Sequence, residues 1–259
     1  MTESADILSP SEAGDEFYVG YLPVPASQRV FLRVALPAVL WLMMAAVAMF
    51  VAGMERDPGG GVWLDQTETF TGLLVVDPYA RLLVVDEDGS VSSLFVVEAG
   101  KLGGGARAER FSGVAVRITG TRLEREGRKM IALSPGDGAI AESGDAPDIV
   151  RASPDARTVS IAGEIVDFKC YLGAMKPGDG KTHRVCATLC VRGGIPPVLV
   201  TTAASGARSY YVLVGPSGQA LNFDVLGFIA EPVRVTGDVQ TRDGVLFLRT
   251  DPAGIERLR

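Results

Sequence analysis

Two distant stretches of the chain share one pattern, and this repeat limits the possible folds strongly. Residues 116–133 (VRITGTRLEREGRKMIAL) align without gaps on residues 233–250 (VRVTGDVQTRDGVLFLRT). The alignment matches Gly120 with Gly237, and a charged turn separates two apolar runs in each copy. Such self-similarity marks a duplicated unit, so the sequence predicts two copies of one small domain, each containing this β-hairpin.

The strands that open the two copies also match, because residues 70–77 (FTGLLVVD) resemble residues 161–167 (IAGEIVD). The matched glycines of opening strand and hairpin lie 48 residues apart in the first copy and 74 in the second, so the second holds about 26 extra residues. Short β-rich runs broken by turn residues predict an all-β fold. About five strands with a long loop after the first favour an OB-like barrel.

We therefore expect two OB-like domains, at residues 67–142 and 158–259. Residues 55–66 and 143–157 are predicted linkers, because they lie between the β-rich runs and are rich in turn-forming residues. The apolar positions predict the cores, namely Leu74, Val76, Val116, Ile118 and Ile131 in the first barrel and Ile165, Val233, Val235 and Leu248 in the second.

An uncharged run at residues 34–54 (VALPAVLWLMMAAVAMFVAGM) precedes the β-rich part. A helix of this length, at 1.5 Å per residue, crosses a bilayer core of about 30 Å, so we expect a transmembrane helix at residues 30–54. The alternatives are a cleaved signal peptide and a buried helix. Residues 1–28 contain five acidic residues and no Lys or Arg, which is the wrong leader for a signal peptide.

The charges that flank this run predict its orientation. Arg29 and Arg33 lie on the N-terminal side, and the positive-inside rule places that side in the cytoplasm. We therefore expect a single-pass protein of the cell inner membrane, with a cytoplasmic tail at residues 1–29 and both β domains in the periplasm, outside the cytoplasm.

All three cysteines of the chain and its single histidine lie in the predicted insertion of the second copy. If residues 182–191 (THRVCATLCV) are helical, His183, Cys186 and Cys190 share one face, and Cys170 has only to fold over them. Three thiolates and one imidazole form a recognised ligand set for structural zinc. The sequence therefore predicts a metal site of Cys170, His183, Cys186 and Cys190. We expect the protein to be a membrane-anchored, extracytoplasmic metal-binding or redox accessory module.

The spacing of these ligands does not identify the metal. C-x12-H-x2-C-x3-C matches neither zinc-finger spacings nor covalent haem attachment, so zinc comes first, with copper or an iron–sulfur centre behind it. In an oxidising compartment a disulfide between Cys170 and Cys186 or Cys190 is the alternative. The protein would then be a scaffold whose insertion is clipped by that bond.

Further residues near the cluster are candidates for supporting or docking roles. Asp167 could accept a hydrogen bond from a metal ligand and so orient it. The segment is basic within a chain of net charge −6, so it favours thiolates and could attract an acidic partner, or could simply be a solvated loop. The candidates are Asp167, Lys169, Lys181 and Arg184.

Several function classes fit the sequence poorly. The net charge of −6 argues against nucleic-acid binding. Gly180-Lys181-Thr182 matches the end of a phosphate-binding loop, but its first glycine would be residue 175, which is Met, so we expect no nucleotide. No paired catalytic groups are visible, so we expect no independent enzymatic activity.

Three short motifs within residues 167–197 resemble those of a known group of proteins. They are D-x-K-C, P-G-x-G-K-x-H-x-x-C-A-x-x-C and G-G-I-P-P. The chain resembles a group of single-span bacterial membrane proteins with an extracytoplasmic OB-like domain. The likeness covers the membrane segment and the part from about residue 158 onward. The resemblance implies an envelope setting beside respiratory oxidoreductases. We expect a subunit of a membrane complex or an assembly factor for one.

Overall fold

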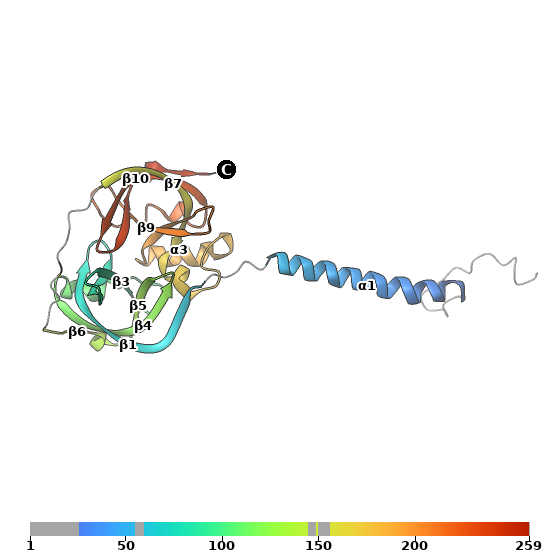
Figure 1. Ribbon diagram of the computed structural model, residues 1–259, viewed down its shortest axis with the longest axis horizontal. Helices are drawn as coiled ribbons and strands as arrows, with labels where there is room; N and C mark the ends of the chain where they lie inside the picture. The colour runs from blue at the N-terminus through green and yellow to red at the C-terminus, as the bar shows by residue number, and fades with distance from the viewer. Residues whose placement is uncertain (1–25, 55–59, 145–148, 150–155, 259) are drawn as a thin grey trace, which may run out of the picture. The chain divides into compact units, whose positions relative to one another are not determined.

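The computed structural model describes residues 26–54, 60–144, 149 and 156–258, and it contains one apolar helix and two β-barrels (Figure 1). Most of the predicted tail and parts of both predicted linkers lie outside the described residues. The chain divides into two units, residues 1–57 and 58–259, and each is described by itself.

The helix α1 spans Ala26–Met54 and includes Pro37. Its segment Gln28–Gly53 has a mean hydropathy of 2.4, and it is the one helix among the described residues that is long and apolar enough to cross a membrane. Trp41 and Phe50 are about 70% exposed. By length and composition α1 could be a single membrane span or a signal sequence.

The first barrel is a mixed ring of five strands. It contains β1 (Val62–Val76), β2 (Ala80–Val85), β3 (Val91–Val97), β4 (Ala115–Arg125) and β5 (Arg128–Leu133). The order β1-β2-β3-β5-β4 closes through β4 and β1, and β3 runs parallel to β5. The short strand β6 (Ile140–Glu142) extends β4, while α2 (Gly105–Ala108) and two short 3-10 turns complete the unit.

The second barrel repeats this topology. Its strands are β7 (Ala156–Asp167), β8 (Pro197–Thr202), β9 (Arg208–Val214), β10 (Pro232–Arg242) and β11 (Val245–Arg249), with β12 (Ile255–Arg257) beside β10. The order β7-β8-β9-β11-β10 closes through β10 and β7, and β9 runs parallel to β11. Both β1 and β7 begin inside segments that the sequence assigns to linkers.

The repeat seen in the sequence is confirmed residue by residue. Gly120 and Gly237 are each the sixth residue of the strand that closes its barrel. At both positions an added Cβ would meet a carbonyl oxygen of the neighbouring strand at 2.4 Å or less, so only glycine lets the strands approach. The hairpin turns match too, because Gly127 and Gly244 both have φ near +75°.

The extra residues of the second copy lie in one place. Residues 77–79 connect β1 to β2, whereas residues 168–196 connect β7 to β8. The connections between the second and fifth strands have equal lengths in the two barrels. The prediction of an insertion after the first strand of the second copy is therefore confirmed, and the insertion contains the Cys/His segment.

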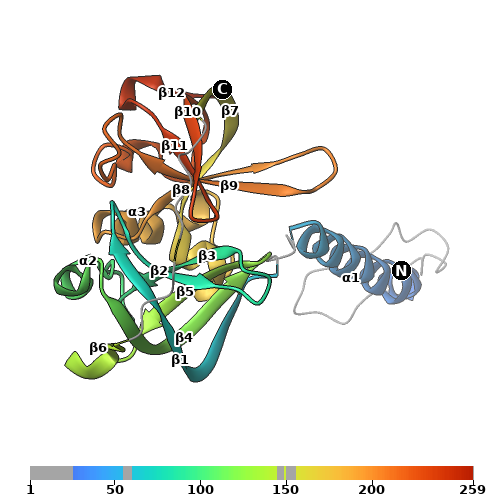
Figure 2. The ribbon, with the colours of Figure 1, turned by 60° about the vertical axis from the view of Figure 1, so that its left-hand side comes forward.

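Each barrel has its own apolar core. Eight of the nine predicted core residues are completely buried, whereas Val76 is only partly buried at the edge of the first core. A third apolar cluster is shared by both barrels. It joins Phe95, Leu123 and Met130 of the first barrel to Phe168, Leu172 and Val212 of the second. The two barrels are thus fused through a common core, to which part of the insertion contributes. Figure 2 shows the strands of the two barrels side by side.

Polar contacts between the barrels follow the internal repeat. Glu126, in the β4–β5 turn, accepts hydrogen bonds from Arg208 and Tyr210 on β9 of the second barrel. Asp243, at the matching turn of the second barrel, contacts Arg81 on β2, and its carbonyl accepts from Ser93 on β3. Each barrel therefore packs its matching hairpin turn against the other barrel. The Glu126–Arg208 pair is exposed, whereas the Arg81–Asp243 pair is buried.

Candidate metal centre

The insertion between β7 and β8 folds into three short helical pieces. These are a π turn η3 (Cys170–Ala174), a 3-10 turn η4 (Lys181–His183) and the helix α3 (Arg184–Arg192). Gly173 lies inside the first turn and has φ of 142°, a conformation that favours glycine. The predicted helix is found at nearly the predicted place, with Cys186 and Cys190 one turn apart on α3 and His183 directly before it.

The sulfur atom of Cys170 lies close to the sulfur atoms of the other two cysteines. Sγ of Cys170 lies 4.0 Å from Sγ of Cys186 and 3.9 Å from Sγ of Cys190. Cys170 and Cys190 are buried, Cys186 is partly exposed, and all three are free thiols. The cluster is thus open to solvent mainly beside Cys186.

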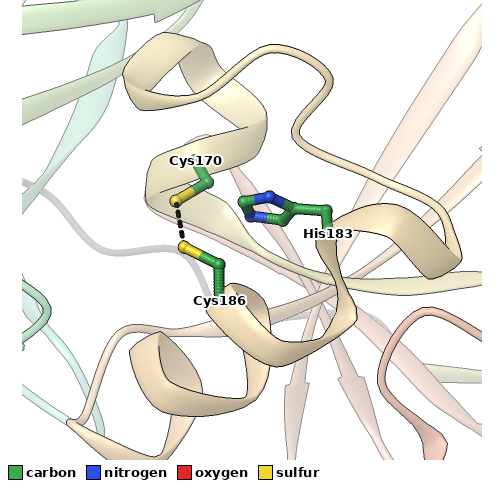
Figure 3. A group of neighbouring side chains, drawn as sticks. All are labelled: Cys170, His183 and Cys186. Carbon is green, nitrogen blue, oxygen red and sulfur yellow. Dashed lines mark hydrogen bonds between the residues drawn. The ribbon is translucent and has the colours of Figure 1, made fainter.

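His183 completes the group. Its ring is buried and points toward the sulfurs of Cys170 and Cys186 (Figure 3). A ligand atom from each of these three residues lies within 4.8 Å of the others, and the same holds for Asp167, Cys170 and Cys190. The structure therefore brings all four predicted ligands into one buried group that could bind a metal ion.

Asp167 contacts two of the predicted ligands. Its side chain is completely buried at the end of β7. One carboxylate oxygen accepts a hydrogen bond from the backbone N–H of Cys170 at 2.8 Å, and the other lies 3.1 Å from Nε2 of His183. Asp167 thus orients the imidazole and fixes the start of the π turn.

The structure adds Lys101, a residue that the sequence analysis did not select. Lys101 lies between β3 and β4 of the first barrel, and its ammonium nitrogen is 2.7 Å from Sγ of Cys186 and 3.9 Å from Sγ of Cys190. The hydrogen bond to Cys186 raises the pKa of Lys101 and so keeps it charged. In the sequence, Lys101 is marked only by its position shortly before a run of glycines at residues 103–105.

Glycine contacts bring the loop of Lys101 to the cluster. The N–H of Gly103 donates to the carbonyl of Gly193, just after α3, at 2.9 Å. A Cβ on Gly103 would lie 2.3 Å from the carbonyl oxygen of Gly194, and one on Gly193 would lie 2.0 Å from that of Lys101. These glycines allow the two backbones to touch, so this glycine run is more than a plain turn.

The other basic candidates occupy different surroundings. Lys169 is buried, and its ammonium donates to the carbonyls of Glu98, Ala99 and Gly100 at 2.5 to 2.8 Å. Burial lowers its pKa. It holds the loop of Lys101 and is not at the surface for docking. Arg184 pairs with Glu231 at 2.5 Å, and Lys181 is exposed.

The thiols differ in acidity. The pKa of Cys170 is raised, first because it shares a hydrogen bond with Cys190 and second because it is buried. That same hydrogen bond lowers the pKa of Cys190. Without a metal, Cys170 therefore keeps its proton and Cys190 is the better thiolate, so a bound cation would have to displace the proton of Cys170.

No family model, curated protein or solved structure matches the chain. The chemistry of the site follows from its own side chains. Thiolates and a neutral imidazole bind soft or borderline metal ions, and a carboxylate behind the imidazole raises its basicity.

Proposed function

We propose that the protein is a membrane-anchored, extracytoplasmic metal-binding module and that zinc is the ion held by Cys170, His183, Cys186 and Cys190. The separation of the sulfurs is the observation that carries this proposal. Zinc–sulfur bonds of about 2.3 Å in a tetrahedron place sulfur atoms about 3.8 Å apart. The Cys170–Cys186 and Cys170–Cys190 sulfur separations of 4.0 and 3.9 Å differ little from this value.

The imidazole is suited to complete the set. Because Nε2 of His183 is turned toward Asp167, Nδ1 is left for a metal ion. A neutral imidazole that donates to a buried carboxylate keeps the tautomer that ligation requires. Four protein ligands close the coordination sphere of zinc, which favours a structural or accessory role over independent catalysis. Bound zinc would order the insertion and the core that both barrels share.

The barrels and α1 supply the setting. The strand order, with parallel third and fifth strands, supports an OB-like assignment for both barrels. Such a pair of barrels outside the inner membrane, tethered by α1, suits a subunit or assembly factor of a membrane complex, including the respiratory setting implied by the resemblance. The alternative is a metal-free scaffold whose insertion is closed by a disulfide.

Metal content tests the proposal directly. The full chain, purified in detergent without a His tag, is expected to contain about one equivalent of zinc per chain by elemental analysis. Thiols are counted in parallel under denaturing conditions with a chelator, and three are expected. Metal-free protein with one titratable thiol would support the disulfide-clipped scaffold. Metal-free protein with three thiols would leave a reduced thiol site and reject the metal module.

Reporter fusions test the topology. We expect alkaline phosphatase fused after Gly60 to be active, because the arginines before α1 favour a cytoplasmic N-terminus. A cytoplasmic reporter at the same junction should be inactive, and phosphatase fused after Arg33 serves as the control without a complete span. The reverse pattern would overturn the orientation. A mature protein that lacks α1 by mass would identify a cleaved signal sequence.

A further inference from the structure

A cavity of about 90 Å³ lies between the two barrels and is lined by both hairpin turns of the internal repeat. Its lining includes Gly127 of the β4–β5 turn and Gly244 of the β10–β11 turn, which the alignment of the two copies matches. Residues 92–95 of β3 and residues 210 and 212 of β9, the third strands of the two barrels, also line it. Equivalent segments of the repeat therefore form this cavity, and none of the four proposed metal ligands lines it.

The two halves of the cavity differ in charge although their backbones repeat. Alignment of the copies matches Arg128 with Val245 and Lys129 with Leu246, and all four residues line the cavity. The first barrel thus has two basic residues where the second has two aliphatic residues. Packing of the barrels does not require this difference. A ligand with one anionic end and one apolar end fits it.

The inner wall of the cavity is apolar. Phe95, Phe168, Tyr210 and Val212 line it and are at most 4% exposed. The ring of Phe168 packs against those of Phe95 and Tyr210, with centroids 5.3 and 6.3 Å apart. The hydroxyl of Tyr210 already donates to Glu126 at 2.6 Å. An alkyl group that enters the cavity therefore leaves water and displaces no hydrogen bond of this wall.

Arg128 supplies the positive charge at the solvent side of the cavity. It is exposed, and its guanidinium carbon lies 5.6 Å from the centroid of the Tyr210 ring. The part of the chain that the structure describes offers this guanidinium no ion-pair partner. A planar guanidinium can donate two parallel hydrogen bonds to one carboxylate.

The acidic residues beside the lining do not occupy Arg128, because each is held by another group. The contacts are those of Glu126 with Arg208, Asp243 with Arg81, and Asp86 with the hydroxyls of Ser90 and Ser92. The positive charge of Arg128 therefore remains for a ligand.

We propose that this cavity binds a short-chain carboxylic acid as its anion, with the carboxylate on Arg128 and the alkyl chain against Phe168 and Val212. An apolar cavity of about 150 Å³ can hold benzene, so the smaller volume here suits a chain of about four to six carbons. Each CH₂ group that leaves water strengthens binding by about fourfold. The site is separate from the metal centre, so a failure of either proposal leaves the other standing.

Methyl-resolved NMR spectra of the full chain in detergent, titrated with hexanoate, test the site. We expect the methyl signals of Val212 and Val245 to shift and to saturate, with empty micelles measured in parallel to correct for hexanoate taken up by detergent. Butyrate, which is two CH₂ groups shorter, should bind about 10-fold more weakly. Hexanol, which has the alkyl chain without the charge, should also bind about 10-fold more weakly.

Two variants examine the two ends of the ligand. Arg128→Gln should weaken hexanoate binding by about 10-fold, because it removes the charge that pairs with the carboxylate. Val245→Phe should fill the cavity and abolish the shift of the Val212 methyl signals. Arg117→Gln, an exposed arginine on β4 of the same barrel, is the matched control and should bind hexanoate like the wild type.

The outcomes are distinct. Loss of binding in Arg128→Gln, with normal binding in Arg117→Gln, supports the site. Methyl shifts that do not saturate, or that persist unchanged in Val245→Phe, would overturn binding in this cavity. Hexanol that binds as tightly as hexanoate, or Arg128→Gln that binds hexanoate as the wild type does, would overturn recognition of the carboxylate.

Discussion

Replacement of Cys170 with serine is expected to reduce the metal content from about one equivalent per chain to less than a tenth. Cys170 is the sulfur that lies within 4.0 Å of both other cysteines, and it is buried against Asp167 and the shared core. A serine hydroxyl is a poor ligand for a borderline-soft ion. Elemental analysis of the full chain in detergent measures the change.

The same substitution should remove the stabilisation that metal gives to the fold. An ion that binds only the native state adds about 4 kcal/mol to the free energy of unfolding when its free concentration is 1,000 times the dissociation constant. Chemical unfolding in buffered zinc and in chelator measures this increment, which we expect in the wild type and not in Cys170→Ser. Because the insertion belongs to the shared core, both barrels should lose stability together.

A packing control separates ligand loss from core damage. Val212 lies on β9 in the same shared cluster and is not one of the proposed ligands. Val212→Ala should lower the free energy of unfolding through lost packing while it keeps both the bound zinc and the zinc-dependent increment. If Cys170→Ser retains a full equivalent of zinc, the sulfur set proposed for the site is wrong.

Replacement of Asp243 with asparagine is expected to lower the free energy of unfolding by about 3–5 kcal/mol. The Arg81–Asp243 ion pair joins the barrels at 3.3 Å, with side chains only 2% and 4% exposed. Asparagine takes the charge of Asp243 away from a guanidinium that stays buried. Asparagine tolerates the left-handed backbone at this position, where φ is 51°, so the effect reports the charge.

The internal repeat supplies the matched comparison. Glu126 occupies the same turn position in the first barrel and pairs across the interface with Arg208, but these side chains are 39% and 30% exposed. Exposed ion pairs contribute about 1 kcal/mol or less, so Glu126→Gln should have a small effect. Equal losses in the two variants, measured by chemical unfolding at the same pH, would show that burial does not control the strength of these contacts.

The sequence alone was sufficient for the features that depend on local pattern. Periodic apolar residues and the turn glycines predicted the strands, because alternation and φ requirements act within a few residues. Comparison of the two copies located the insertion after the first strand. The offsets of Cys186 and Cys190 predicted one helical face, and helix geometry fixes such neighbours.

Other features were decided only by tertiary structure. Lys101 lies 85 residues from Cys186 in the chain, and no spacing rule joins them. Lys169 looked like a basic surface residue, yet its ammonium is buried beneath a loop of the other barrel. The shared core is formed by apolar residues of both barrels. Their sequence pattern does not show that they pack against each other across the two barrels.

The physical reason is the range of the interactions involved. Strand alternation, turn conformation and helical offset are set by neighbouring residues, so the sequence determined the repeated barrels, the insertion and the cluster of thiols and imidazole. The approach of Gly103 to Gly193, and with it the charge beside the sulfurs, depends on how the two barrels pack. That packing is a sum of many distant contacts, and only the folded chain brings them together.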